Sequence, residues 1–172
     1  RNISVSTSND GNITFGGNVN SRTLTASADG NGDIVQTSGT LSASSSMSLS
    51  SDHGDIGNSK SALRVNTPTL QVETGRSGLV NISASGDLQL LDSSSGGNFT
   101  VSTQGNLTAN DVSTRDGSIT LTAGNSVSIA KDASLIANEG NLTIQSRNTD
   151  SGTITIGKNV DLEAFSARSD SG

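Results

Sequence analysis

Three ionisable side chains lie close together in the sequence, namely Asp52, His53 and Asp55. A histidine between two carboxylates could act as a general base or as a weak metal ligand. The three residues surround Gly54 within a Ser-rich stretch, which is typical of an exposed turn. We therefore interpret the group as a solvated corner and predict no catalytic residue in this chain.

A second candidate is the segment Asp29-Gly30-Asn31-Gly32-Asp33, which spaces three oxygen ligands as a calcium-binding loop does. The rest of that pattern is missing, because Ile34 stands where the loop glycine belongs and Thr40 where the bidentate Glu belongs. We predict a plain turn here, and neither a metal site nor a cofactor site elsewhere.

Six Asn-x-Ser/Thr sequons are also present, and each could accept a glycan on a surface loop. They begin at Asn2, Asn12, Asn81, Asn98, Asn106 and Asn141. Asn followed by an apolar residue and Thr is also what the repeat described below dictates. We interpret most of the sequons as by-products of strand patterning, with surface glycosylation as the alternative.

The composition narrows the class of protein. Ser, Thr, Asn and Gly number 32, 19, 17 and 20, and fill over half of the 172 residues. There is no Cys, only 2% of the residues are aromatic, and the net charge is −6. The chain therefore has no disulfide framework and little with which to stack bases, and its charge disfavours nucleic acid as a partner. No apolar run is long enough to span a membrane as a helix.

An internal repeat decides the expected fold. A glycine, a polar residue and two apolar residues flanking one position recur, as in Gly117-Ser118-Ile119-Thr120-Leu121. The repeats start at residues 11, 32, 54, 78, 97, 117 and 140, so that successive starts are 19 to 24 residues apart. Such a period is typical of a repeat architecture in which each unit buries its apolar face against the next.

Within each unit, apolar and polar residues alternate, which is the pattern of a strand with one buried face. We predict an all-β parallel solenoid with coils of about 19–24 residues. The apolar residues Ile119, Leu121, Val127, Ile129, Leu142 and Ile144 should point inward, and the polar residues Thr120, Ser128 and Thr143 outward.

Two segments depart from the regular spacing. Gly140 and Gly152 are only 12 residues apart, which indicates either an inserted strand and turn or one enlarged coil over 140–171. A similar arrangement in the first twenty residues favours the enlarged coil. The Ser-rich stretch 36–62 is the other irregular segment, and Pro68 after it is expected at a corner because it lacks a ladder donor.

The repeat resembles the haemagglutinin-type repeats of filamentous haemagglutinin and related two-partner-secretion exoproteins. The closest stretches are Gly-Asn-Leu-Thr-Ala at 105–109, Gly-Ser-Ile-Thr-Leu-Thr-Ala-Gly at 117–124 and Gly-Asn-Leu-Thr-Ile at 140–144. The resemblance is strongest over 78–172. It implies a right-handed β-helix, secretion through an outer-membrane two-partner-secretion pore, and a place at the bacterial cell surface.

Two functional classes follow. The first is a structural shaft segment of a large secreted or surface-exposed adhesin, with residues 1–172 as one β-helix segment of a longer filamentous protein. Its partners would be the export pore and a host-cell or surface receptor, such as a glycan. The alternative is a β-helix that binds or degrades polysaccharide. The first class is favoured, because the charged residues of 97–139 lie mostly at turns and no aromatic groove is encoded. We expect no enzymatic activity, no nucleic-acid partner and no membrane-spanning segment.

Overall fold

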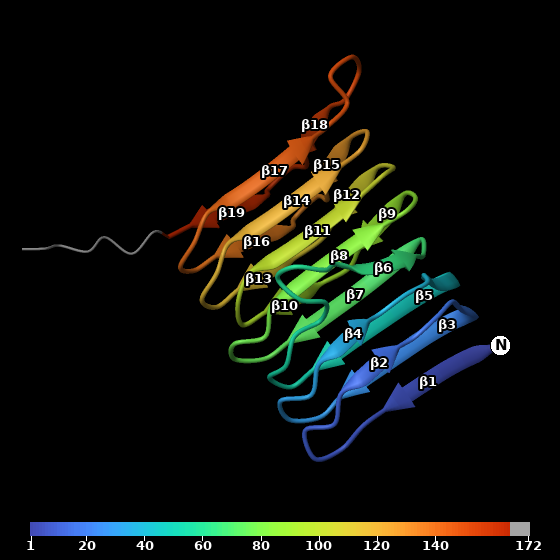
Figure 1. The fold of residues 1–172 in the computed structure, drawn as a ribbon. Coiled ribbons are helices and arrows are strands. Elements are labelled where there is room, and N and C mark those ends of the chain that lie inside the picture. Colours follow the sequence, from blue (N-terminus) through green and yellow to red (C-terminus); the bar gives the residue numbers. More distant parts are fainter. Residues whose placement is uncertain (166–172) are drawn as a thin grey trace, which may run out of the picture.

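The computed structural model describes residues 1–165, which form a parallel β-solenoid of about seven turns (Figure 1). Each coil lays down up to three short strands, and most strands pair in parallel with their equivalents in the next coil. Val80 pairs with Phe99, 19 residues later, and Leu41 with Val65, 24 residues later. The predicted fold class is therefore confirmed, and so is the predicted coil length for all coils but the last.

Three faces run the length of the solenoid. Face A carries the ladder β1 (Asn2–Ser6), β3 (Val19–Ala28), β5 (Leu41–Ser51), β7 (Thr69–Thr74), β10 (Ser93–Ser95), β13 (Val112–Thr114), β16 (Ser134–Ala137) and β19 (Asp161–Ala164). Face B carries β2 (Ile13–Phe15), β4 (Ile34–Gln36), the single bridge residue Ile56, β8 (Val80–Ala84), β11 (Phe99–Thr103), β14 (Ile119–Ala123) and β17 (Leu142–Ser146).

Face C begins with the first residues of β3 and β5, because both long strands turn a corner. It continues with β6 (Leu63–Asn66), β9 (Leu88–Leu90), β12 (Leu107–Ala109), β15 (Val127–Ile129) and β18 (Ile154–Ile156). The ladder is broken between β6 and β9, because β6 pairs with β8 of face B and β9 pairs with β7 of face A. In β3 the turn coincides with a register shift between Ser21 and Thr23.

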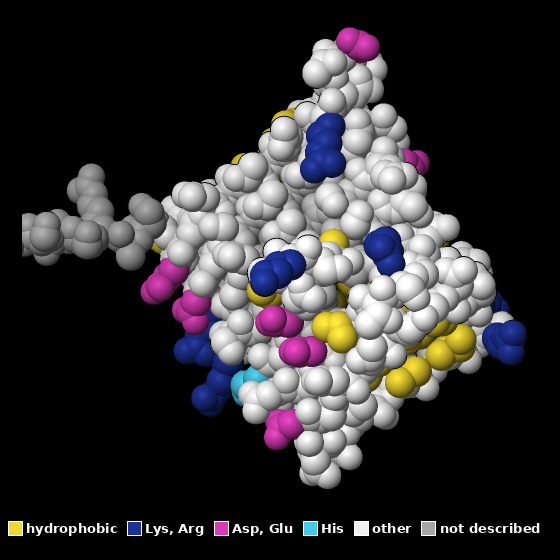
Figure 2. All heavy atoms as spheres, viewed as in Figure 1, with side chains coloured by type: hydrophobic (Ala, Val, Ile, Leu, Met, Phe, Trp, Pro, Cys, Tyr) yellow, Lys and Arg dark blue, Asp and Glu magenta, His cyan; other side chains and the backbone are white. Residues whose placement is uncertain are grey.

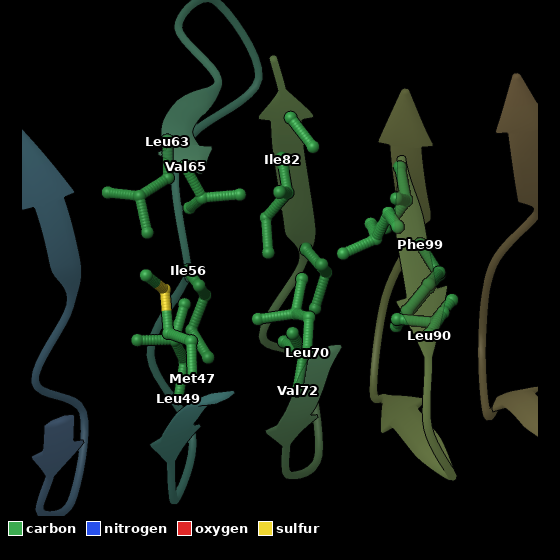
Figure 3. Packing of buried hydrophobic residues seen from close by; sticks show 14 of the residues in the cluster. Met47, Leu49, Ile56, Leu63, Val65, Leu70, Val72, Ile82, Leu90 and Phe99 are labelled. Atoms are coloured by element: carbon green, nitrogen blue, oxygen red, sulfur yellow. The ribbon is translucent and has the colours of Figure 1, made fainter. Parts of the chain in front are cut away.

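The core is a set of apolar columns inside the three faces. Figure 3 shows Met47 and Leu49 of one coil beside Leu70 and Val72 of the next, with their side chains directed into the same interior. Most of these side chains are fully buried, and Phe99 is the largest. Period-2 alternation explains the arrangement, since every second residue of a strand faces inward.

The accessibilities test the predicted orientation of nine residues. Ile119, Leu121, Val127 and Ile129 are at most 1% exposed, as predicted. The outward residues Thr120 and Ser128 are half-buried and Thr143 is exposed. Leu142 and Ile144 are only half-buried, because they belong to the last coil and are covered on one side alone.

The enlarged last coil is confirmed as far as residue 165, and the rest of the predicted range 140–171 lies outside the described residues. The strands β17, β18 and β19 form one coil, and the pairing of Val127 with Ile154 spans 27 residues instead of 19 to 24. Its extra residues lie in the turn around Asn148, whose Oδ1 accepts the N–H groups of Asp150 and Ser151. Pro68 lies at a corner between β6 and β7, also as predicted.

Candidate functional site

A hollow of about 470 Å³ lies beside the predicted Asp52–His53 corner. It is lined by Ser50, Ser51, Asp52, His53, Glu73 and Gly75. Asp52 and His53 follow β5, and Glu73 is the outward residue of β7 that pairs with Ser50. The sequence pattern alone did not single out Glu73, although the repeat spacing of 23 residues places it beside Ser50.

The structure places Asp52 and His53 at the hollow and Asp55 away from it. The Asp52 Oδ2 accepts the backbone N–H of Gly30 at 3.2 Å, in the preceding coil. Asp55 belongs to another ladder, since its Oδ1 accepts the N–H of Leu79 at 2.9 Å and it does not line the hollow. His53 therefore has only Asp52 and Glu73 as acidic neighbours in the hollow. The Asp55 carboxylate is instead occupied by its hydrogen bond to the backbone of the next coil.

The segment with calcium-like spacing also holds neighbouring coils together. The Asp29 carboxylate accepts the N–H of Asn9 at 2.9 Å, the Asn31 backbone and side-chain amides donate to Asp10, and the Asp33 carboxylate accepts the N–H of Asp55. These side chains point to different backbone partners. Among residues 1–165, no group of three or more His, Cys, Asp or Glu side chains is arranged to hold a metal ion.

Electrostatics at this corner centre on Asp29. The pKa of its carboxyl lies below the ordinary Asp value of 3.8, chiefly because the N–H of Asn9 donates to the charged form and secondly because of the Asp52 side chain beside it. Asp29 is at the surface. The lowered pKa therefore reports a well-hydrogen-bonded turn.

A ladder of Asn and Asp side chains runs up the corner that precedes face B. The Asn12 Oδ1 accepts the N–H of Asp33, Asp33 accepts that of Asp55, and Asn98 accepts that of Ser118 at 2.9 Å. Each side chain thus satisfies a backbone donor of the following coil at a point where strand pairing lapses.

Several sequons serve this purpose. The amide oxygens of Asn12, Asn98 and Asn106 accept backbone N–H groups of the next coil, and Asn81 donates to the carbonyl of Asn58 at 2.7 Å. Asn2 and Asn141 are exposed, and the backbone N–H of Asn141 donates to Ser118. The repeat motif is therefore explained by coil stacking, whatever the glycosylation of these residues.

The repeated glycines form a second ladder at the same corner. A Cβ built on Gly117 would lie 2.5 Å from the carbonyl carbon of Gly97, and one on Gly140 would lie 2.6 Å from that of Gly117. Gly54 and Gly78 likewise approach the backbone of the preceding repeat glycine. Glycine recurs because the coils approach each other too closely here for any side chain.

Buried hydroxyl groups complete the corner. Thr74, Ser95 and Thr114 occupy one inward column at the end of face A, and each is at most 4% exposed. Their hydroxyls donate to the carbonyls of Gly78, Gly97 and Gly117 at 2.6 Å. These bonds give the buried hydroxyls an acceptor in the turn; the carbonyl of Gly78 also accepts the backbone N–H of Gly97 at 2.9 Å.

The middle coil departs from this regularity. After the bridge at Ile56, Gly57 takes a φ of +79° and residues 58–62 leave the sheet as a loop. The Asn58 Oδ1 accepts the N–H groups of Lys60 and Ser61, which closes the loop. The sequence indicated an irregular segment here but gave no signal for two hollows that lie farther along the chain, at Pro68.

Those hollows lie on either side of Pro68. One, of about 270 Å³, is lined by Asn20, Ser21, Ser42, Ala43, Ser44, Asn66 and Pro68. The other, of about 250 Å³, is lined by Pro68, Asp87, Leu88, Gln89, Asn106 and Thr108. Amide and hydroxyl side chains contribute to both linings, beside Pro68 and, in the second hollow, Leu88 and Asp87.

The fold and its corner ladders define a parallel β-solenoid repeat protein. Comparison with protein-family models, curated proteins and solved structures found no match. Over the described residues 1–165, no helix is long and apolar enough to cross a membrane.

Proposed function

We propose that this chain is a structural shaft segment of a large secreted or surface-exposed bacterial adhesin, which holds a binding or effector region away from the cell. The observation that carries the proposal is the use of corner side chains. Asn, Asp, Gly, Ser and Thr residues of successive coils are committed to the backbone of neighbouring coils. A rod whose successive coils are bonded to one another is suited to hold a distal region at a fixed distance and to bear mechanical load.

The surface supports the same role. Most of the face seen in Figure 2 is neither charged nor hydrophobic, and charged side chains are scattered over it. The ion pairs found in the described chain, Arg115–Asp116 and Lys131–Asp132, join exposed neighbours in sequence. The last coil leaves Ile154, Ile156, Leu162 and Phe165 43–53% exposed, and these would be covered by a further coil of the same kind.

The wider assignment follows from the sequence resemblance. A shaft of this kind would leave the cell through an outer-membrane two-partner-secretion pore and would remain secreted or at the cell surface, where it supports attachment to host cells and contributes to virulence. Its receptor would bind through this segment or through neighbouring regions. An enzymatic role is not part of the proposal.

Attachment under flow tests the proposal. Cells display the chain with a biotin tag at its distal end, and they are passed over streptavidin covered by polymer layers of increasing thickness. Duplicating residues 93–134 adds two coils in register, because Ser93, Val112 and Leu135 share one column. Each coil adds about 4.8 Å.

We expect the lengthened chain to keep its attachment at thicker polymer layers. A duplication of residues 93–133 is the matched control, since it is one residue out of register and should lose the gain. Attachment that does not depend on the number of coils would overturn the shaft proposal.

A further inference from the structure

The register of face C changes at Pro68. Below it, Asn20 pairs with Ser42 and Ser42 with Asn66. Above it, the pairing resumes with Thr69 opposite Gln89, and the carbonyl of Pro68 accepts the N–H of Gln89 at 2.8 Å. The two hollows flank this break, so that Pro68 forms a shared wall between them.

The side-chain amides near Pro68 on face C differ from those at the corners in their hydrogen bonding. Asn20, Asn66 and Gln89 are exposed, and within residues 1–165 their side chains make no hydrogen bond to other protein groups. Corner amides such as Asn98 are instead occupied by the next coil. An Asn or Gln side chain offers both donors and an acceptor. These three side chains can therefore donate hydrogen bonds to a ligand and accept them from it.

We propose that face C around Pro68 binds a neutral, extended polysaccharide chain that lies along the solenoid axis. The outward residues form two offset rows, Asn20–Ser42–Asn66 below Pro68 and Thr69–Gln89–Thr108 above it, which together cover five successive coils and span about 20 Å along the axis at the usual strand spacing. A β-1,4-linked chain advances by close to one coil spacing per sugar. Each coil can therefore offer a polar group to one sugar ring.

Charge and shape select the ligand class. No charged residue lines the hollow below Pro68, and Asp87 is the single charged residue that lines the hollow above it. The Asp87 Oδ1 already accepts two hydrogen bonds from Asn106, at 2.7 and 3.1 Å. A polyanion would meet this carboxylate and the net charge of −6. The Pro68 ring is exposed and offers an apolar surface to the C–H face of a sugar.

This inference goes beyond the shaft role and does not depend on it. A segment that holds a distal region away from the cell can also bind a glycan along its side, and the flow experiment above is insensitive to such binding because its attachment is through biotin.

Calorimetric titration of the full chain with defined hexasaccharides tests the inference. The probes are cellohexaose, mannohexaose and xylohexaose, which are β-1,4-linked, with maltohexaose and hexagalacturonate for comparison. We expect saturable binding of at least one β-1,4-linked probe and weaker binding of maltohexaose, whose α-linkages curve the chain, and of the anionic hexagalacturonate.

Two variants localise the binding. Asn66→Ala combined with Gln89→Ala removes hydrogen-bonding groups on either side of Pro68 and should weaken binding about tenfold or more. The matched control is Gln71→Ala, an exposed glutamine on face A, which should leave the affinity unchanged. Circular dichroism melting of the variants checks that the fold is retained.

Three results would overturn the inference. They are no binding of any β-1,4-linked hexasaccharide, equal or tighter binding of maltohexaose or hexagalacturonate, and unchanged affinity in the folded double variant.

Discussion

The coils over residues 93–137 and the middle coil over residues 52–68 follow different rules. In the first region, each strand has a partner in the coil before and after it, and corner residues such as Asn98, Thr114 and Gly117 fix the spacing. In the second, face B is reduced to the bridge residue Ile56 and a loop leaves the sheet.

Both regions nevertheless bury their apolar residues fully. Leu63 and Val65 of the middle coil are as inaccessible as Leu121 of the regular coils, and Figure 3 shows them directed into the same interior as Ile82. The comparison teaches that the core column is essential, whereas the outer path of a coil is free to vary. The variable path is where hollows and unpaired amides arise.

Insertion of one residue should give the largest difference in stability between the two regions. A Ser inserted after Ser102, within β11, would turn the following inward residues outward and should abolish cooperative folding of that part of the solenoid. The same insertion after Ser59, in the loop, should cost less than about 0.6 kcal/mol, because it only lengthens an exposed loop. Thermal unfolding measures both, and equal destabilisation would contradict the comparison.

A core truncation tests whether coverage on both sides matters. Leu121→Ala should lower the free energy of unfolding by about 3 kcal/mol, because a fully buried leucine leaves a cavity between two coils. Leu142→Ala, in the next coil opposite Ile119, should cost about half as much, since Leu142 is covered on one side only. Urea unfolding monitored by circular dichroism gives the two values. A larger loss at Leu142 would show that the last coil is better packed than its exposure indicates.

The glycine ladder gives a smaller effect. Gly117→Ala would place its Cβ against the backbone of Gly97 and should destabilise the chain by about 2 kcal/mol. The control Gly17→Ala has no atom within 4 Å of the new Cβ and should change stability by less than about 1 kcal/mol. A neutral Gly117→Ala would mean that the coils can separate at this corner without cost.

The smallest expected effect is a dependence on pH at the Asp29 turn. Because the folded-state pKa of Asp29 is lowered, its charged form stabilises the fold above the ordinary value of 3.8, and this contribution is lost as the pH falls through the folded pKa. Asp29→Asn should therefore lower the stability slightly near neutrality and leave it unchanged at the lowest pH, so that the acid limb of the stability curve is flatter. Melting temperatures between pH 2 and pH 7 measure this. An unchanged acid limb would show that the turn does not depend on this carboxylate.

Much of the fold was encoded in local patterns. The spacing of Gly97, Gly117 and Gly140 predicted the coil length, because only glycine fits where successive coils meet. Alternation in segments such as 119–123 predicted which residues face inward, since a strand's side chains alternate between its two faces. The enlarged last coil was also visible in the glycine spacing.

The candidate site was not encoded locally. Asp52, His53 and Asp55 are adjacent in sequence, yet the turn at Gly54 sends Asp55 to a different ladder. Glu73 reaches the same hollow as His53 only because its strand stacks one coil above.

The sequence by itself therefore determined the repeat length, the strand faces and the corner residues of this protein, because each of them recurs as a pattern of residue types at a fixed spacing. The tertiary structure alone decided where the register of face C changes, and that Asn66 and Gln89 line two hollows on either side of Pro68. The physical reason is that a contact between coils joins residues about 20 positions apart, and a shift of one or two residues in the loop before it changes which side chains meet.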